Sequence, residues 1–228
     1  MVKLISPAES GALDTLLASY AGGHLSAALH ALVSSHLVLS TSNQAFVAAL
    51  ETCLSRAIEL APVDGAPEDR DRRLNAIFEH GGATEPAGPG EAAGSASADM
   101  LPEPLRRFVG KDISALAWRT RIPGLREYTV EKLDGAEASL LWVRAGRKMP
   151  SHTHGGSEVT LVLSGSFDDH RGRYGRGEIV MADAEVDHAP RAGSEEDCLC
   201  FTVIDAPLRL TSPIGQILSQ LLGGAQKT

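Results

Sequence analysis

The sequence is short of cysteine and of long apolar runs, and each shortage excludes a class of protein. Three cysteines in 228 residues are too few for a disulfide-stapled fold. No stretch approaches the roughly 20 uninterrupted apolar residues that a membrane span needs. Residues 1–7 also lack the basic-then-apolar layout of a signal peptide. We therefore expect a cytoplasmic protein that does not associate with a membrane.

Basic residues are also scarce, since 21 Lys and Arg face 29 Asp and Glu and the net charge is −8. Residues 1–80 hold five basic and nine acidic residues. Residues 81–104 hold no basic residue and four acidic ones, and residues 105–228 hold sixteen basic and sixteen acidic residues. Binding to a phosphate backbone requires a local basic surplus, so we expect no direct contact with DNA or RNA. The 43% hydrophobic content still suffices for a packed core, which excludes wholesale disorder.

The composition divides the chain into two units. Residues 81–99 are almost entirely Gly, Ala, Pro, Ser and acidic residues, and none of them is a large apolar residue. Such a segment cannot bury enough surface to offset its ordering entropy. We predict a helical unit over residues 1–80, a flexible linker over residues 81–104 and a second unit over residues 105–228.

The first unit has the apolar spacing of helices, with three helices and a short fourth from about Glu68 to His80. Ser26 is placed to cap the second helix. The three predicted apolar stripes are Leu13, Leu16, Leu17 and Tyr20; Leu29, Leu32, Val33, His36 and Leu37; and Phe46, Val47, Leu50, Cys53, Leu54 and Ile58. A helical unit of this size is marginally stable alone. It therefore either buries its stripes against a partner protein or caps the second unit.

The second unit consists of short strand-like runs separated by turn residues at intervals of roughly 8–15 residues. This spacing predicts an antiparallel sandwich or barrel. A last amphipathic helix is expected over residues 214–222. The five predicted strands are Glu127–Leu133, Ala138–Val143, Glu158–Leu163, Glu178–Met181 and Leu199–Ile204.

One constellation of metal-ligating residues lies in this second unit. His152, His154 and Glu158 stand in the gapless pattern G-x5-H-x-H-x3-E-x6-G, and His188 follows on what we expect to be a partner strand. Residues of equal parity in a strand face the same side, which brings the first three together. Three neutral imidazoles and one carboxylate suit tetrahedral zinc, or iron, manganese or nickel if waters complete an octahedron. We predict one divalent metal ion held by these four residues.

The same residues match the first cupin motif, and residues 105–210 as a whole resemble a cupin domain. The second motif is degenerate, because Arg176 stands where the motif has Pro and Ala192 where it has Asn. The resemblance implies a double-stranded β-helix barrel with the metal inside. The expected fold class is therefore a multi-domain α plus all-β protein, in which a small helical bundle is joined by a linker to a cupin barrel.

The whole chain resembles the ChrR-type anti-sigma factors, which combine a helical zinc anti-sigma domain, a linker and a cupin. The matching stretches are residues 16–23, 118–120, 140–142, 158–167 and 205–209. The resemblance implies a transcription regulator whose N-terminal helices bind an extracytoplasmic-function (ECF) sigma factor. It also implies that the cupin domain responds to singlet oxygen or organic peroxide.

The front zinc motif of that family is lost here. The family binds this zinc through an upstream His and an H-x3-C-x2-C motif. In this chain the H-x3-C-x2-C motif aligns with His36, Ser40 and Asn43, and the upstream region, residues 6–14, contains no histidine. Ser and Asn are far poorer zinc ligands than thiolates. We therefore predict no metal in residues 1–80, a core position for His36, and turn and helix-capping roles for Ser40 and Asn43.

Two other functions fit the same residues. The chain could be a cupin metalloenzyme, such as a dioxygenase or an isomerase, with the helices as a cap. It could also be a barrel whose zinc is structural and whose helices serve dimerisation. We interpret Cys198 and Cys200, which share one strand face, as buried structural thiols. Residues 168–170 are interpreted as a solvated turn, and the arginines 171, 173 and 176 as a solvated face.

Overall fold

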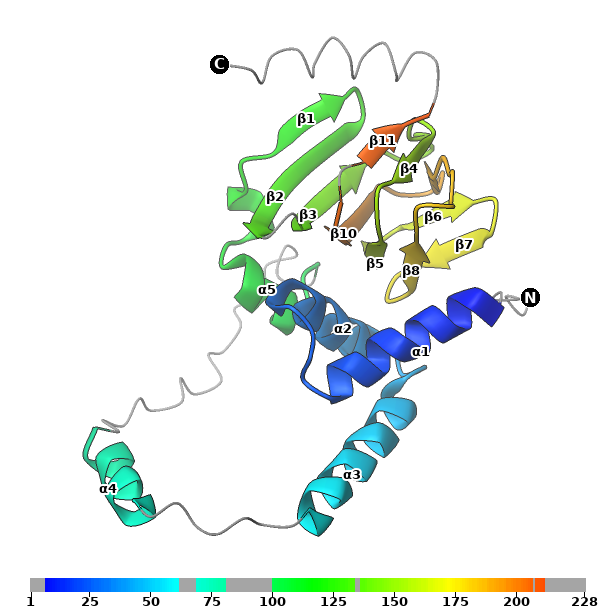
Figure 1. Ribbon diagram of the computed structural model, residues 1–228. Coiled ribbons are helices and arrows are strands. Elements are labelled where there is room, and N and C mark those ends of the chain that lie inside the picture. Colours follow the sequence, from blue (N-terminus) through cyan, green and yellow to red (C-terminus); the bar gives the residue numbers. More distant parts are fainter. Residues whose placement is uncertain (1–6, 62–68, 81–99, 134–135, 207, 212–228) are drawn as a thin grey trace.

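A computed structural model describes residues 7–61, 69–80, 100–133, 136–206 and 208–211. In this part of the chain, helices gather at one side of a β-barrel (Figure 1). No helix in it combines the length and the apolar character that crossing a membrane requires. Most of the predicted linker, residues 81–99, and the predicted terminal helix over residues 214–222 lie outside the described residues.

Four helices form the N-terminal part, as the apolar spacing predicts. They are α1 (Pro7–Ala21), α2 (Ala27–Leu39), α3 (Gln44–Leu60) and α4 (Arg70–His80). Gly23, at φ +69°, takes the left-handed conformation just beyond the end of α1. The predicted cap of α2 is confirmed, because the Ser26 side chain accepts the Leu29 N–H at 3.4 Å.

The C-terminal part begins with α5 (Glu103–Val109) and the 3-10 turn η1 (Ile113–Ala115), and the elements described after them, up to residue 211, are strands. All five predicted strands are present to within about two residues at each end. The sequence reasoning missed α5 and the shorter strands. The strands are β1 (Arg119–Ile122), β2 (Leu125–Leu133), β3 (Ala136–Val143), β4 (His152–His154), β5 (Glu158–Ser164), β6 (Ser166–Asp169), β7 (Gly172–Gly175), β8 (Ile179–Ala182), β9 (Arg191–Ala192), β10 (Cys198–Ile204) and β11 (Leu208–Leu210).

The strands make three antiparallel sheets. A six-stranded sheet has the order β1-β2-β3-β10-β5-β8, a three-stranded sheet has the order β7-β6-β9, and β11 pairs with β4. Side chains from both larger sheets meet in one apolar cluster that includes Val162, Phe167, Tyr174 and Cys200. This cluster lines the interior of the barrel.

Strand β5 is buried on both faces, and its alternation decides what each face does. Val159, Leu161 and Leu163 belong to a second core, outside the barrel, which the helices share. Glu158 and Thr160 instead line a cavity inside the barrel. The period of two along this strand therefore places the site and the helices on its opposite sides.

Helices α1 and α2 cover the outer face of the six-stranded sheet. Leu17 of α1, Leu32 of α2 and Leu105 of α5 are fully buried in the same core as Leu161 and Phe201 of the sheet. These two helices therefore act as a cap on the barrel, which supplies the stabilising contacts that a small helical unit lacks by itself.

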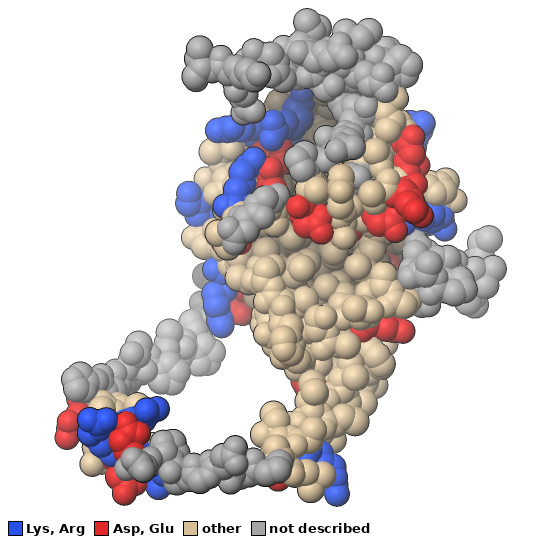
Figure 2. All heavy atoms as spheres, in the orientation of Figure 1, with Lys and Arg blue, Asp and Glu red and all other residues tan. Residues whose placement is uncertain are grey.

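Helix α3 differs from its prediction. Val47 is its buried residue, whereas Phe46 is 40% exposed, Ile58 is 76% exposed and Cys53 lies at the surface. We interpreted Cys53, a member of the predicted stripe, as a core residue, and this interpretation is wrong. In Figure 1, α3 and α4 extend away from the barrel, and Figure 2 shows few charged side chains over α1, α2 and α3.

Candidate metal centre

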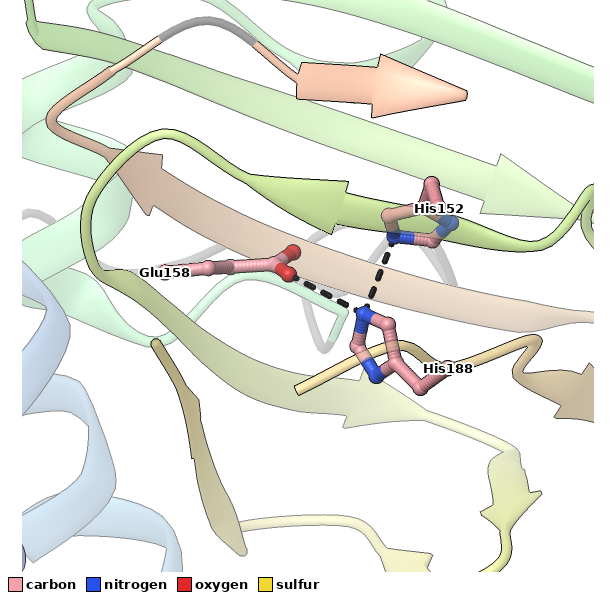
Figure 3. Close-up of side chains that lie close together, drawn as sticks. All are labelled: His152, Glu158 and His188. Carbon is pink, nitrogen blue, oxygen red and sulfur yellow. Dashed lines mark hydrogen bonds and ion pairs between the residues drawn. The ribbon is translucent and has the colours of Figure 1, made fainter. Parts of the chain in front are cut away.

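Three segments bring the candidate ligands together inside the barrel. His152 opens β4 and forms an antiparallel bridge with His188, in which each backbone N–H donates to the other residue's carbonyl at 3.0 Å. Glu158 opens β5 and points toward the same place (Figure 3). The three side chains are buried.

The ligand atoms converge on one point. His188 Nε2 lies 3.0 Å from His152 Nε2 and 3.6 Å from Glu158 Oε2. One donor atom from each of the three residues lies within 4.8 Å of those of the other two. A zinc ion with bonds of about 2.0–2.2 Å to nitrogen and oxygen spans separations of this size. The residues present therefore fit a divalent cation.

Neighbouring groups fix the orientation of two of these side chains. The Pro150 carbonyl lies 2.9 Å from His152 Nδ1, and because a carbonyl can only accept, Nδ1 carries the proton. His152 Nε2 is then left with its lone pair facing the site. The Thr160 hydroxyl donates to Glu158 Oε1 at 3.1 Å, which holds the carboxylate in place. Such outer contacts are typical of metal-binding histidines and carboxylates.

The electrostatics of the site favour positive charge. Burial would lower the pKa of His188, but the carboxylates of Asp169 and Glu158 outweigh it and raise that pKa to about 9. Burial likewise opposes ionisation of Asp169, yet contacts with His188 and Arg171 hold the pKa of its carboxyl well below its usual range. The pocket thus stabilises a cationic centre among its carboxylates.

His154, the remaining predicted ligand, lies in β4, where its backbone pairs with Leu208. Its side chain is outside the described part of the structure. The four-residue ligand set of His152, His154, Glu158 and His188 therefore stays a prediction, of which the structure brings three members together.

The interpretation of residues 168–170 as a solvated turn is wrong for Asp169. This residue ends β6, and its side chain is fully buried with Oδ2 3.7 Å from His188 Nδ1. Arg171, which we assigned to a solvated face, is also largely buried and donates to Asp169. A sequence signal existed, because Asp169 shares its strand parity with Phe167, a residue of the barrel interior.

The cysteine pair takes the predicted position. Cys198 and Cys200 are buried in β10 and line the site cavity, with their sulfurs 3.5 Å apart. The neighbouring thiol and burial raise the pKa of Cys200 well above its usual value. A protonated thiol is a poor nucleophile and a poor metal ligand, which agrees with a structural role.

His36 is a buried core residue, as predicted. Its Nδ1 donates to the Gly177 carbonyl at 2.6 Å, and its Nε2 accepts from Asn43 Nδ2 at 3.0 Å. Ser40 ends α2 in a turn, with its hydroxyl 2.9 Å from that of Ser42. Asn43 does occupy the N-cap position of α3, but its side chain makes no capping bond because it turns to His36 instead.

The antiparallel barrel and its inward-facing ligand cluster define a cupin-like protein. A family model described as the ChrR cupin-like domain matches residues 107–206. The anti-sigma-E factor ChrR of Cereibacter sphaeroides is 35% identical over 203 residues, which cover 87% of this chain and 91% of that protein. The crystal structure of Rhodobacter sphaeroides SigE in complex with the anti-sigma ChrR matches with a TM-score of 0.69 and 32% identity, over 84% of this chain and 96% of that one. The chain belongs to the ChrR family of anti-sigma factors.

Proposed function

We propose that this chain holds an ECF sigma factor with its N-terminal helices, and that a metal-bound cupin barrel controls this hold in response to reactive oxygen or peroxide. Its relative of 32% identity was solved in complex with the sigma factor SigE. In this proposal residues 1–80 bind the sigma factor, residues 81–104 connect the two parts, and residues 105–228 bind the metal through His152, His154, Glu158 and His188.

The observation that carries the sigma-binding role is the exposure of large apolar side chains on α3 and α4. Phe46, Leu54 and Ile58 on α3 and Ile77 and Phe78 on α4 all face solvent, and Phe78 is 77% exposed. Fully burying one large apolar side chain stabilises a protein or a complex by about 1.5–3 kcal/mol. Because α3 and α4 expose several such side chains, the two helices are suited to binding a protein partner.

Packing against the barrel can stabilise the N-terminal helices in place of the zinc ion that the lost motif would bind. Structural zinc binding contributes its free energy to folding, and here α1 and α2 instead bury Leu17 and Leu32 against the sheet. Asn43 and His36, at positions of the lost zinc motif, are hydrogen-bonded to each other, and His36 also donates to the Gly177 carbonyl in the barrel turn. This supports a helical part that is ordered by docking on the barrel.

One strand supplies a physical connection between the metal centre and the helices. Glu158 faces the centre from the inner side of β5, while Val159 and Leu161 of the same strand pack in the core with α1 and α2. When bound, a divalent cation would tie the segments that carry His152, Glu158 and His188 together and supply a Lewis-acidic centre. A shift of Glu158 would therefore disturb the outer core and bias the docking of the helices.

Sigma binding is tested by calorimetric titration of the purified full chain with a purified ECF sigma factor, such as the SigE that was solved with its relative. Ile58→Asp and Phe78→Asp each place a charge on the exposed apolar faces, and we expect each to weaken binding at least about tenfold, as loss of a central apolar contact typically does. Leu133→Asp is the matched control, because Leu133 is 60% exposed on β2 of the barrel, and it should bind as the wild type does. A wild-type chain that binds no sigma factor but turns over a diketone or a sugar phosphate would instead be a cupin enzyme.

A further inference from the structure

A buried carboxylate stands directly behind the metal-site histidine His188. The side chain of Asp169, at the end of β6, is fully buried, and its Oδ2 lies 3.7 Å from His188 Nδ1. The other ring nitrogen, Nε2, faces His152 and Glu158. The imidazole of His188 therefore lies between the candidate metal position on one side and the Asp169 carboxylate on the other.

The Asp169 carboxylate is held rigidly by its own neighbours. Its Oδ1 accepts the backbone N–H of Arg171 at 2.8 Å and that of Gly172 at 3.2 Å. Its Oδ2 accepts from Arg171 Nε at 3.0 Å and Nη2 at 2.9 Å. The same guanidinium donates through Nη1 to the Met181 carbonyl of β8 at 2.6 Å. The β6–β7 turn and strand β8 together fix where the carboxylate lies.

This arrangement decides which nitrogen of His188 can bind a metal. A neutral imidazole carries one N–H, and an ionised carboxylate can only accept, so Asp169 stabilises the form with the proton on Nδ1. The lone pair is then on Nε2 and faces the site. The Pro150 carbonyl imposes the same choice on His152 from the other side of the pocket. Both rings thus present lone pairs to one point.

We propose that Asp169, braced by Arg171, is a positioning residue of the metal centre that fixes the tautomer and ring orientation of His188. This inference rests on the metal centre of the proposed function and adds a residue to it. Removing an outer-shell carboxylate of this kind lowers metal affinity about 10- to 100-fold.

The competing hypothesis is that Asp169 only stabilises the β6–β7 turn. The variant Asp169→Asn distinguishes this hypothesis from a role in positioning His188. Asparagine keeps a carbonyl oxygen for the backbone N–H groups of Arg171 and Gly172, so the backbone contacts of the turn are preserved, although the two guanidinium contacts to Oδ2 are lost. It replaces the oxygen facing His188 with an amide group that can only donate. Asp168→Asn is the matched control, because Asp168 is the preceding residue of β6, is about half exposed and lies 4.0 Å from Arg173.

The experiment measures zinc affinity of the full-length chain by competition with a chromophoric chelator, together with the imidazole nitrogen NMR signals of the zinc-loaded protein. We expect Asp169→Asn to bind zinc about 10- to 100-fold more weakly and to lose the protected Nδ1–H signal of His188. Asp168→Asn should match the wild type in both measurements. Wild-type affinity and signals in Asp169→Asn, or an equal loss in Asp168→Asn, would overturn the proposal.

Two further outcomes distinguish a failure of the proposed role of Asp169 from a failure of metal binding as a whole. If the wild type binds no zinc, the metal centre of the proposed function fails as a whole. If Asp169→Asn does not fold, the zinc-loaded wild type still decides the question. Ligation through Nε2 with a protected Nδ1–H supports the role of Asp169, and ligation through Nδ1 contradicts it.

Discussion

The imidazole of His36 ties helix α2 to the barrel, because its Nδ1 donates to the Gly177 carbonyl at 2.6 Å across 141 residues of sequence. Gly177 lies between β7 and β8, in the turn that leads into the six-stranded sheet. Asn43 satisfies the second ring nitrogen from the start of α3. A residue from the lost zinc motif thus joins α2, α3 and the barrel.

Replacing His36 should destabilise the docking of the helices on the barrel. His36→Ala removes a buried ring and leaves the Gly177 carbonyl without its donor, and we expect a loss of about 2–4 kcal/mol in the free energy of unfolding. Urea titration followed by circular dichroism measures it. His24→Ala, at an exposed site just after α1, is the control and should unfold as the wild type does. Equal stability of His36→Ala and the wild type would contradict the role assigned to this contact.

The same histidine should make stability depend on pH. Burial lowers the pKa of His36 in the folded chain, so the unfolded chain binds the proton more readily. The contribution of His36 to stability is therefore complete above about pH 6.5 and is lost as the pH falls below that value. The difference in unfolding free energy between the wild type and His36→Gln should shrink from pH 7.5 to pH 5. A difference that stays constant or grows would rule out this assignment.

Gly177 also limits how closely α2 can approach. Its φ of +84° is unfavourable for other residues, and a Cβ there would lie 3.1 Å from the Cβ of Leu39. Gly177→Ala should therefore cost about 1–2 kcal/mol from backbone strain alone. Gly175→Ala, where a Cβ meets nothing closer than 3.8 Å, provides the comparison. Thermal unfolding of the two variants measures the difference, and equal melting temperatures would contradict the backbone strain and the close approach of α2 that we assign to Gly177.

Metal analysis should find one divalent ion per chain. The donors of the barrel site converge, whereas His36 has both ring nitrogens engaged by Gly177 and Asn43. Glu158→Ala should lower the content toward zero, while Glu185→Ala, at an exposed neighbouring acid, should leave it unchanged. Plasma emission spectrometry of the purified chain gives the count. Two ions per chain would show that the front site survives in another form.

The barrel strands could be predicted because their pattern is local. In β5 and β10 apolar residues occupy both faces, and the period of two fixes which side chains share a face whatever lies beyond. The pattern G-x5-H-x-H-x3-E-x6-G likewise fixes His152 and Glu158 near one another. His188 was expected on a partner strand, and in the structure it lies outside the named strands and forms an isolated bridge with His152.

What the sequence could not reveal depends on contacts between distant residues. The apolar spacing of α3 is the same whether a core or a partner covers it, so the exposure of Phe46 and Ile58 was not predictable from period alone. The sequence of residues 168–170, Asp-Asp-His, is typical of a polar turn when it is considered without its distant contacts. The burial of Asp169 arises from His188, which lies 19 residues later and on another segment.

The central claim is that the metal centre in the barrel controls release of the sigma factor. The direct measurement is the fraction of the preformed complex that dissociates after exposure to singlet oxygen or an organic peroxide, followed by size-exclusion chromatography for the wild type and Glu158→Ala. The account predicts that both chains bind the sigma factor before exposure, that the wild-type complex dissociates, and that the Glu158→Ala complex persists. Equal dissociation of the two complexes would contradict it.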